Sequence, residues 1–206
     1  MAVITIARQF GAGGYSVAGL VAERLGADVV DKALIDEVAR RLAVSPGEVE
    51  AEDERGLSLA DRLVRSFGPL AFATGTGWPT PETASLVDAH GAVRDLTEQV
   101  IQEVARSDKV VIVGRGAAVV LKDHPRTLHV FICAPEAARI ATVMQRFGLD
   151  EPTARGRGRE MDSARAAYLR QAYGVDWLDP LLYDLILNTG RLGYDRSADL
   201  ILAAVG

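Results

Sequence analysis

Short apolar runs alternate with amphipathic segments along most of the chain. Five runs, each bounded by turn-forming residues, have the length and composition of buried strands: 3–7, 28–30, 110–113, 128–132 and 183–187. Between them, apolar residues recur at the spacing of helices, chiefly in 17–25, 93–105, 135–147, 160–173 and 196–204. Strands that alternate with helices are typical of a parallel sheet. We therefore expect a three-layer α/β/α fold around a five-stranded parallel sheet.

One stretch interrupts this alternation. The sequence Ser-Pro-Gly-Glu at 45–48 combines an N-cap serine, a proline at the first helical position and an acid, so it predicts the start of a helix. Residues 58–72 also have a helical period, and the Gly- and Pro-rich stretch at 74–81 is the strongest break in the chain. We interpret 45–90 as a helical insert within a single domain that spans 1–206.

The composition and net charge of the chain argue against several classes of protein. The chain has 206 residues, of which 49% are hydrophobic and 25% charged, as in ordinary globular domains. Its net charge of -5 gives no support for binding to a nucleic acid polymer or a membrane surface. The single cysteine, Cys133, excludes an internal disulfide and a Cys-rich zinc site. With no apolar run of about 20 residues and no signal-peptide pattern, we expect a cytoplasmic protein. Monomer and homodimer both remain open.

A glycine-rich loop directly follows the first predicted strand. Its glycines allow a tight turn and a close approach of the backbone to a ligand, and its N–H groups, with the start of the next helix, form an anion site. A βα turn without a ligand is the alternative interpretation, but the position after the first strand favours a phosphate. The candidate phosphate-binding residues are Gly11, Ala12, Gly13, Gly14, Tyr15 and Ser16. The Ser16 hydroxyl is also a candidate ligand of Mg²⁺.

Charged residues follow two other predicted strands. Asp31 follows the second strand and Arg115 the third, at the carboxyl edge of the sheet, where α/β folds bind ligands. Asp31 is equally suited to cap a helix, and Arg115 to pair with a nearby acid. Asp162 and Arg165 have the i, i+3 spacing of either a surface ion pair or a binding pair.

A basic segment with two glycines lies between two predicted helices. Residues 150–159 (DEPTARGRGR) predict a loop in which Arg155, Arg157 and Arg159 alternate with glycines. Such a segment suits a lid, at about 150–160, that closes over phosphates, and a plain basic loop is the alternative.

These motifs together resemble the cytidylate kinase-like family of P-loop nucleoside monophosphate kinases. The opening ITIARQFGAGGYS is similar to the strand and loop of bacterial cytidylate kinases, roughly ITIDGPSGAGKGT. It is closer still to the cytidylate kinase-like family, in which an arginine and an aromatic residue precede G-x-G-G. The segments VDKALI at 30–35, VGRGA at 113–117, D-x-x-R at 162–165 and DLILNTGRL at 184–192 fit the same family in order.

The resemblance implies a P-loop kinase fold and an enzyme that transfers the γ-phosphate of ATP, with Mg²⁺, to CMP or dCMP. It implies that the insert binds a monophosphate, and that the glycine loop and the arginines of the lid hold ATP. It also implies that the acceptor nucleotide contacts Asp31, Arg115, Asp162 and Arg165. The candidate catalytic cations are Arg8, Arg115 and Arg165.

The loop departs from the P-loop signature, which ends in Gly-Lys-Ser/Thr. Gly14 stands at the lysine position and Tyr15 follows it. Loss of one well-placed charge costs about 10²–10³ in rate, unless Arg8, Arg115 or the lid arginines replace it. Asp36 and Glu37 stand where cytidylate kinases have a Tyr-Arg pair. Two alternatives to cytidylate transfer therefore remain: a degenerate nucleotide-binding regulatory module, and a kinase with another small acceptor.

Overall fold

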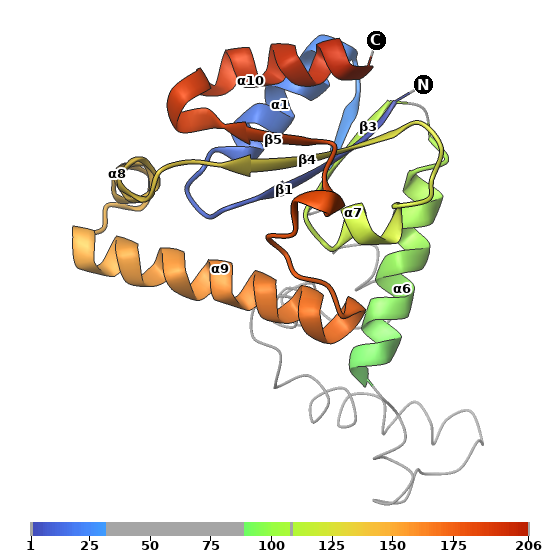
Figure 1. The fold of residues 1–206 in the computed structure, drawn as a ribbon, viewed down its shortest axis with the longest axis horizontal. Coiled ribbons are helices and arrows are strands. Elements are labelled where there is room, and N and C mark those ends of the chain that lie inside the picture. The colour runs from blue at the N-terminus through green and yellow to red at the C-terminus, as the bar shows by residue number, and fades with distance from the viewer. Residues whose placement is uncertain (1, 32–88, 108, 206) are drawn as a thin grey trace, which may run out of the picture. The chain divides into compact units, whose positions relative to one another are not determined.

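The computed structural model describes residues 2–31, 89–107 and 109–205. Its elements, in chain order, are β1 (Val3–Arg8), α1 (Gly14–Leu25), β2 (Asp28–Val30), α6 (Ala89–Val104), β3 (Val110–Val113), α7 (Ala117–Val120), β4 (Thr127–Cys133), α8 (Glu136–Phe147), α9 (Glu151–Tyr173), the 3₁₀ turn η1 (Pro180–Leu182), β5 (Leu185–Asn188) and α10 (Thr189–Val205) (Figure 1). Residues 45–88 of the predicted insert, with Asp36 and Glu37, lie outside the described residues. The chain divides into two compact units, 1–31 with 101–206 and 32–100.

The five strands form one parallel sheet in the order β2-β3-β1-β4-β5. Val3 of β1 lies opposite Val110 of β3 on one side and Thr127 of β4 on the other. This arrangement confirms the expected five-stranded parallel sheet, and it places β3, the strand before Arg115, beside β1. The glycine loop therefore leaves the central strand of the sheet.

Helices cover both faces of the sheet. In Figure 1, α1 and α10 lie on one face, and α7 and α9 lie on the other. Because side chains alternate along a strand, Ile4 and Ile6 of β1 pack toward α1 and α10, in a core that includes Val17 and Ile201. On the other face, Phe131 packs against Leu169 of α9 and against Trp177. The sheet is thus the middle of three layers.

The segment expected as a loop at 150–159 is the first part of α9, so the loop prediction is wrong. Asp150 caps the helix, because its Oδ1 accepts a hydrogen bond from the Thr153 N–H at 3.1 Å. Arg155 forms an i, i+4 ion pair with Glu151 at 2.8 Å and reaches Glu136 of α8 at 2.9 Å. The two glycines within this helix cost about 1 kcal/mol each, and the cap and the contacts with α8 offset that cost.

A second boundary also differs from the prediction. The helix expected at 196–204 belongs to α10, which begins at Thr189, directly after the end of β5. The Thr189 hydroxyl donates its proton to the Ala12 carbonyl oxygen at 2.7 Å, and its oxygen also lies 3.2 Å from the Cys133 carbonyl oxygen. These contacts join the glycine loop, β4 and α10.

Among the helices in the described parts of the chain, none combines the length and apolar composition that crossing a bilayer requires.

Candidate active site

The conformation of the glycine loop requires glycine at two positions. Gly11 and Gly13 have φ values of +80° and +79°, in the left-handed region that favours glycine. A Cβ on Gly11 would lie 2.6 Å from the Arg139 carbonyl oxygen, and a Cβ on Gly13 would overlap the Tyr194 ring. The predicted glycines therefore fix the loop between α8 and α10.

The first turn of α1 offers N–H groups to an anion. Gly13 caps this helix without a side-chain hydrogen bond, and the first intrahelical bond runs from the Val17 N–H to the Gly13 carbonyl oxygen at 3.0 Å. The N–H groups of Gly14, Tyr15 and Ser16 precede that bond and have no intrahelical partner. The helix dipole adds positive potential at the same place.

These groups border a cavity of about 400 Å³ whose wall includes Arg8, Gly11, Gly13, Gly14, Ser16 and Arg165. Its glycine and cationic wall fits the phosphates of a nucleotide. Within the described residues, no cluster of three or more His, Cys, Asp or Glu side chains is placed to hold a metal ion. Ser16, whose hydroxyl was predicted as a ligand of Mg²⁺, borders this cavity, and its role as a ligand stays a prediction.

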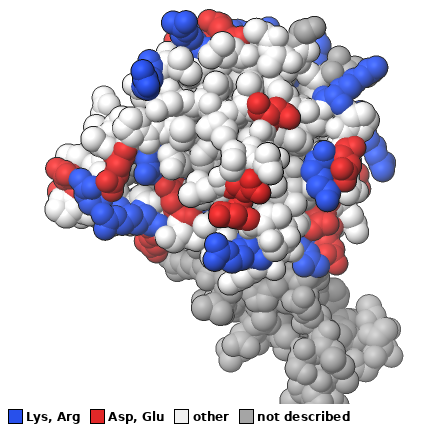
Figure 2. All heavy atoms as spheres, viewed as in Figure 1, with Lys and Arg blue, Asp and Glu red and all other residues white. Residues whose placement is uncertain are grey.

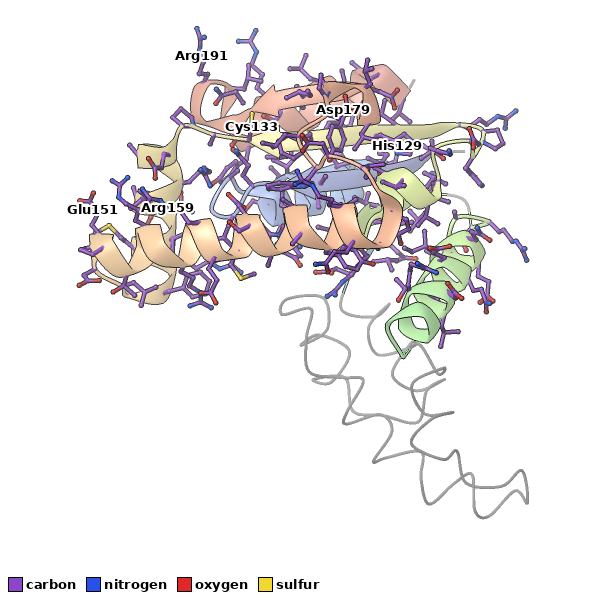
Figure 3. All side chains as sticks on the ribbon, turned by 60° about the horizontal axis from the view of Figure 1, so that its bottom comes forward. His129, Cys133, Glu151, Arg159, Asp179 and Arg191 are labelled. Carbon is purple, nitrogen blue, oxygen red and sulfur yellow. The ribbon has the colours of Figure 1, made fainter. Side chains whose placement is uncertain are left out.

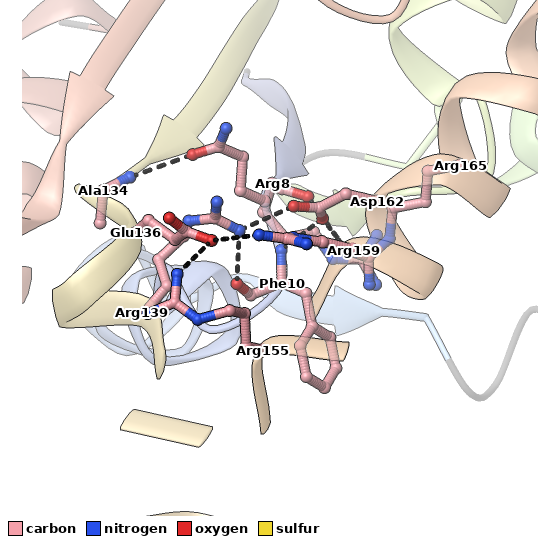
Figure 4. A network of polar contacts seen from close by, with 10 residues as sticks. Arg8, Phe10, Ala134, Glu136, Arg139, Arg155, Arg159, Asp162 and Arg165 are labelled. Carbon is pink, nitrogen blue, oxygen red and sulfur yellow. Dashed lines mark hydrogen bonds and ion pairs between the residues drawn. The ribbon is translucent and has the colours of Figure 1, made fainter. Parts of the chain in front are cut away.

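Asp162 joins the glycine loop to α8 and α9 (Figure 4). Its Oδ1 accepts from the Phe10 N–H at 2.7 Å and from Arg165 Nη1 at 3.2 Å. Its Oδ2 accepts from Arg139 Nη1 at 2.7 Å, and that same Nη1 donates to the Phe10 carbonyl oxygen at 3.2 Å. Asp162, predicted to contact the acceptor nucleotide, is thus bound in this structure by the protein's own loop, and its contact with a nucleotide stays a prediction.

Arg139 is a site residue that the sequence analysis missed. It lies within an amphipathic helix, where a single arginine belongs to no motif. Its partners Phe10 and Asp162 come from β1's loop and α9, and only the fold brings them together.

Arg165, a predicted catalytic residue, lies against the start of the loop. Its Nη1 donates to the Arg8 carbonyl oxygen at 3.3 Å, and its guanidinium carbon is 5.8 Å from the centre of the Phe10 ring. Both Arg8 and Arg165 border the large cavity. The structure therefore brings two of the three predicted catalytic arginines to the predicted phosphate site.

The third arginine, Arg115, pairs with Asp31 at the ends of β3 and β2. Arg115 Nε lies 3.6 Å from Asp31 Oδ1, and the two side chains are only 10% and 13% exposed. Arg115 has a φ of +57° and stands between Gly114 and Gly116, at +79° and +69°. A residue other than glycine in this left-handed region costs about 1–3 kcal/mol, and such residues cluster at functional sites. Two residues predicted to face the acceptor are thus in contact with each other.

The three arginines expected in a lid contact α8, and Arg157 also lies 5.9 Å from the centre of the Phe10 ring at the start of the glycine loop. Arg155 and Arg159 reach Glu136 at 2.9 and 3.8 Å, and Arg157 lies 4.6 Å from the centre of the Phe147 ring. Figure 3 shows Glu151 and Arg159 near the start of α9, and Figure 2 shows basic and acidic side chains interspersed on this part of the surface. A smaller cavity of about 210 Å³ lies beneath them, bordered by Arg139, Arg155 and Arg159.

Comparison with known proteins finds one family model and several cytidylate kinases. The model of the Cytidylate kinase-like family matches residues 3–191. A cytidylate kinase from Methanopyrus kandleri is 34% identical over 112 residues, which cover 50% of this chain and 58% of that protein, so the match spans little more than half of the relative's length. A cytidylate kinase from Archaeoglobus fulgidus is 27% identical over 203 residues, which cover 98% of this chain and 93% of the relative.

Two solved structures share the fold over nearly the whole chain. An uncharacterized protein from Eubacterium ventriosum has a TM-score of 0.70 at 24% identity, covering 100% of this chain and 98% of its own. A shikimate kinase from Bacteroides thetaiotaomicron has a TM-score of 0.55 at 14% identity, covering 99% and 98%. At these identities the likeness shows the fold alone, which is that of the P-loop kinases.

Proposed function

Because the chain belongs to the cytidylate kinase-like family, we propose that it transfers the γ-phosphoryl group of ATP to a pyrimidine nucleoside monophosphate such as CMP or dCMP. The observation that carries this proposal is the cavity at the first turn of α1, where helix N–H groups and three arginines, Arg8, Arg146 and Arg165, converge. That arrangement suits a polyphosphate better than a neutral ligand.

The donor would occupy the glycine loop. Magnesium ATP supplies the transferable phosphoryl group and a divalent counter-charge. The N–H groups of Gly14, Tyr15 and Ser16 would hold phosphate oxygens, and the Ser16 hydroxyl would serve the metal. Gly11 and Gly13 allow the loop to pack closely against α8 and α10, because a Cβ at either position would collide with those helices.

The acceptor would lie toward the ends of β2 and β3. Asp31 and Arg115 offer a carboxylate acceptor and guanidinium donors side by side, a combination that suits the edge of a base with both an amino group and a carbonyl. The acceptor phosphate would approach Arg165. In-line attack by its oxygen needs no covalent intermediate, so the protein's contribution is positioning and charge. Arg8 and Arg165 would offset the charge on the transferring group.

A coupled ADP-release assay tests the proposal, with magnesium ATP against CMP, dCMP, UMP, AMP and GMP, and with ATP binding measured by calorimetry. Gly13→Ala should abolish both binding and turnover, because its Cβ would overlap Tyr194. Gly19→Ala is the matched control: it lies in the same helix with open space around it, so both properties should survive. Absence of turnover with every acceptor would refute the kinase proposal.

A second candidate is a nucleotide-binding regulatory module. Gly14 at the lysine position favours it, as do α9 arginines that are bound to Glu136. ATP binding with no phosphoryl transfer to these acceptors would support this candidate. Turnover with a small molecule other than a nucleotide would instead identify a kinase with a different acceptor.

A further inference from the structure

Arg8 occupies the space that a side chain at position 14 would fill. A Cβ placed on Gly14 would lie 2.6 Å from Arg8 Cβ and 2.7 Å from Arg8 Cγ, whereas non-bonded carbon atoms prefer about 3.5–4.0 Å. These are the first two carbons of the arginine side chain, and the end of β1 fixes where they stand. The loop therefore has room for a side chain at position 8 or at position 14, but not at both.

The far end of Arg8 is held between α1 and β3. Its Nη2 donates to the Tyr15 hydroxyl at 3.1 Å, and its guanidinium carbon lies 5.1 Å from the centre of the Tyr15 ring. A Cβ on Gly114, directly after β3, would overlap Arg8 Nη1. Gly114 thus leaves space for the guanidinium on one side, and Tyr15 orients it on the other.

This position is the right one for a cation that serves bound phosphates. Arg8 borders the same cavity as Ser16 and the first turn of α1. Arginine has five N–H donors in a fixed fork, so a bond to Tyr15 is compatible with contacts to phosphate oxygens.

The P-loop signature spacing places glycine at position 8 and lysine at position 14, and this chain has arginine at 8 and glycine at 14. We propose that the loop has exchanged its cation between its two ends: Arg8 supplies the charge that lysine supplies in the signature, and Tyr15 and Gly114 position it. This proposal rests on the proposed function only in taking a nucleoside triphosphate as the ligand.

The test compares Arg8→Gln, Gly14→Lys and the double variant Arg8→Gly/Gly14→Lys. Arg8→Gln keeps the stem of the side chain and removes its charge, so we expect ATP affinity to fall at least tenfold and turnover to fall about 10²–10³-fold. Gly14→Lys alone should be equally defective, because its side chain collides with Arg8. The double variant should recover at least tenfold over either single variant. Arg196→Ala, an exposed arginine on α10, is the control and should behave as wild type.

Calorimetry with ATP and with inorganic tripolyphosphate accompanies the kinetics, and circular dichroism checks folding. If Arg8→Gln bound ATP with wild-type affinity, the proposed exchange of the cation would be overturned. It would also be overturned if the two substitutions had additive effects on ATP affinity in a folded double variant. If the double variant does not fold, Arg8→Gln decides the question, together with Tyr15→Phe, which should weaken tripolyphosphate binding. A wild-type protein that transfers no phosphate but shows these binding effects would refute the kinase proposal and leave the exchange standing. Failure of the wild type to bind either ligand would refute both.

Discussion

Replacing Asp162 with alanine should destabilise the protein far more than the loss of an equally short ion pair on the surface would. The substitution removes the acceptor of the Phe10 N–H and leaves Arg139 and Arg165 beside each other without their shared carboxylate. The side chains of Asp162 and Arg139 are each only 17% exposed, so little water replaces the lost bonds. Breaking a buried ion pair typically costs 3–5 kcal/mol. With this residual exposure we expect the lower end, about 3 kcal/mol.

Urea unfolding followed by circular dichroism measures this loss directly, and a melting curve should shift by about 6–12 °C for a domain of this size. Asp195→Ala is the matched control, because Asp195 pairs with Arg24 at 2.6 Å while its own side chain is 80% exposed. Exposed pairs contribute about 0–1 kcal/mol. ATP affinity should also fall in Asp162→Ala, since the Phe10 end of the loop loses its anchor, and should not change in Asp195→Ala. Equal losses of stability in the two variants would refute the reasoning.

Three further predictions follow from other parts of the site. Arg115→Ala should leave ATP affinity nearly intact in calorimetry while it abolishes transfer, and equal loss of both would assign this arginine to the donor. Glu136→Gln should raise ATP affinity at low salt, because Arg159 loses its ion pair with this residue and Arg155 keeps only its pair with Glu151. An unchanged affinity would show that these two arginines do not reach the phosphates. Burial lowers the pKa of His129 from its ordinary 6.5, so the unfolded chain binds its proton more tightly. The free energy of unfolding should then decrease as the pH falls below about 6.5, and His129→Gln should flatten that dependence.

The strands were predictable because each is a compact apolar run. Residues 28–30 and 110–113 were predicted with the bounds that the structure has. The run at 110–113 is buried on both faces, which leaves little ambiguity about where its strand ends, whereas 28–30 is a largely exposed edge strand that only its short β-prone sequence indicated. The first turn of α9 was not predictable in the same way, because Gly156 and Gly158 favour a loop locally. A contact with Glu136, distant in sequence, offsets that preference.

Some residues of the candidate site were likewise predictable from a local sequence pattern, and others were not. The glycine loop was identified from its sequence, since glycines after a strand form a local pattern. Arg8 was predicted as a candidate catalytic cation, but its packing over Gly14 depends on how β1 meets α1 and could not be predicted. Arg139 had no signal, because one cation on an amphipathic helix looks like any solvated position. Such residues are identified only from contacts between elements that are distant in the sequence.

The bonds of Thr189 have a mechanical consequence for how the site can change shape. This buried hydroxyl fastens the glycine loop to β4 and to the start of α10, so those three parts move as one body. The first turns of α9 are fastened to α8 by exposed charged side chains, which yield readily to competing anions and to salt. Any closure around a ligand is therefore expected to come from α9, while the wall formed by the loop, β4 and α10 keeps its shape.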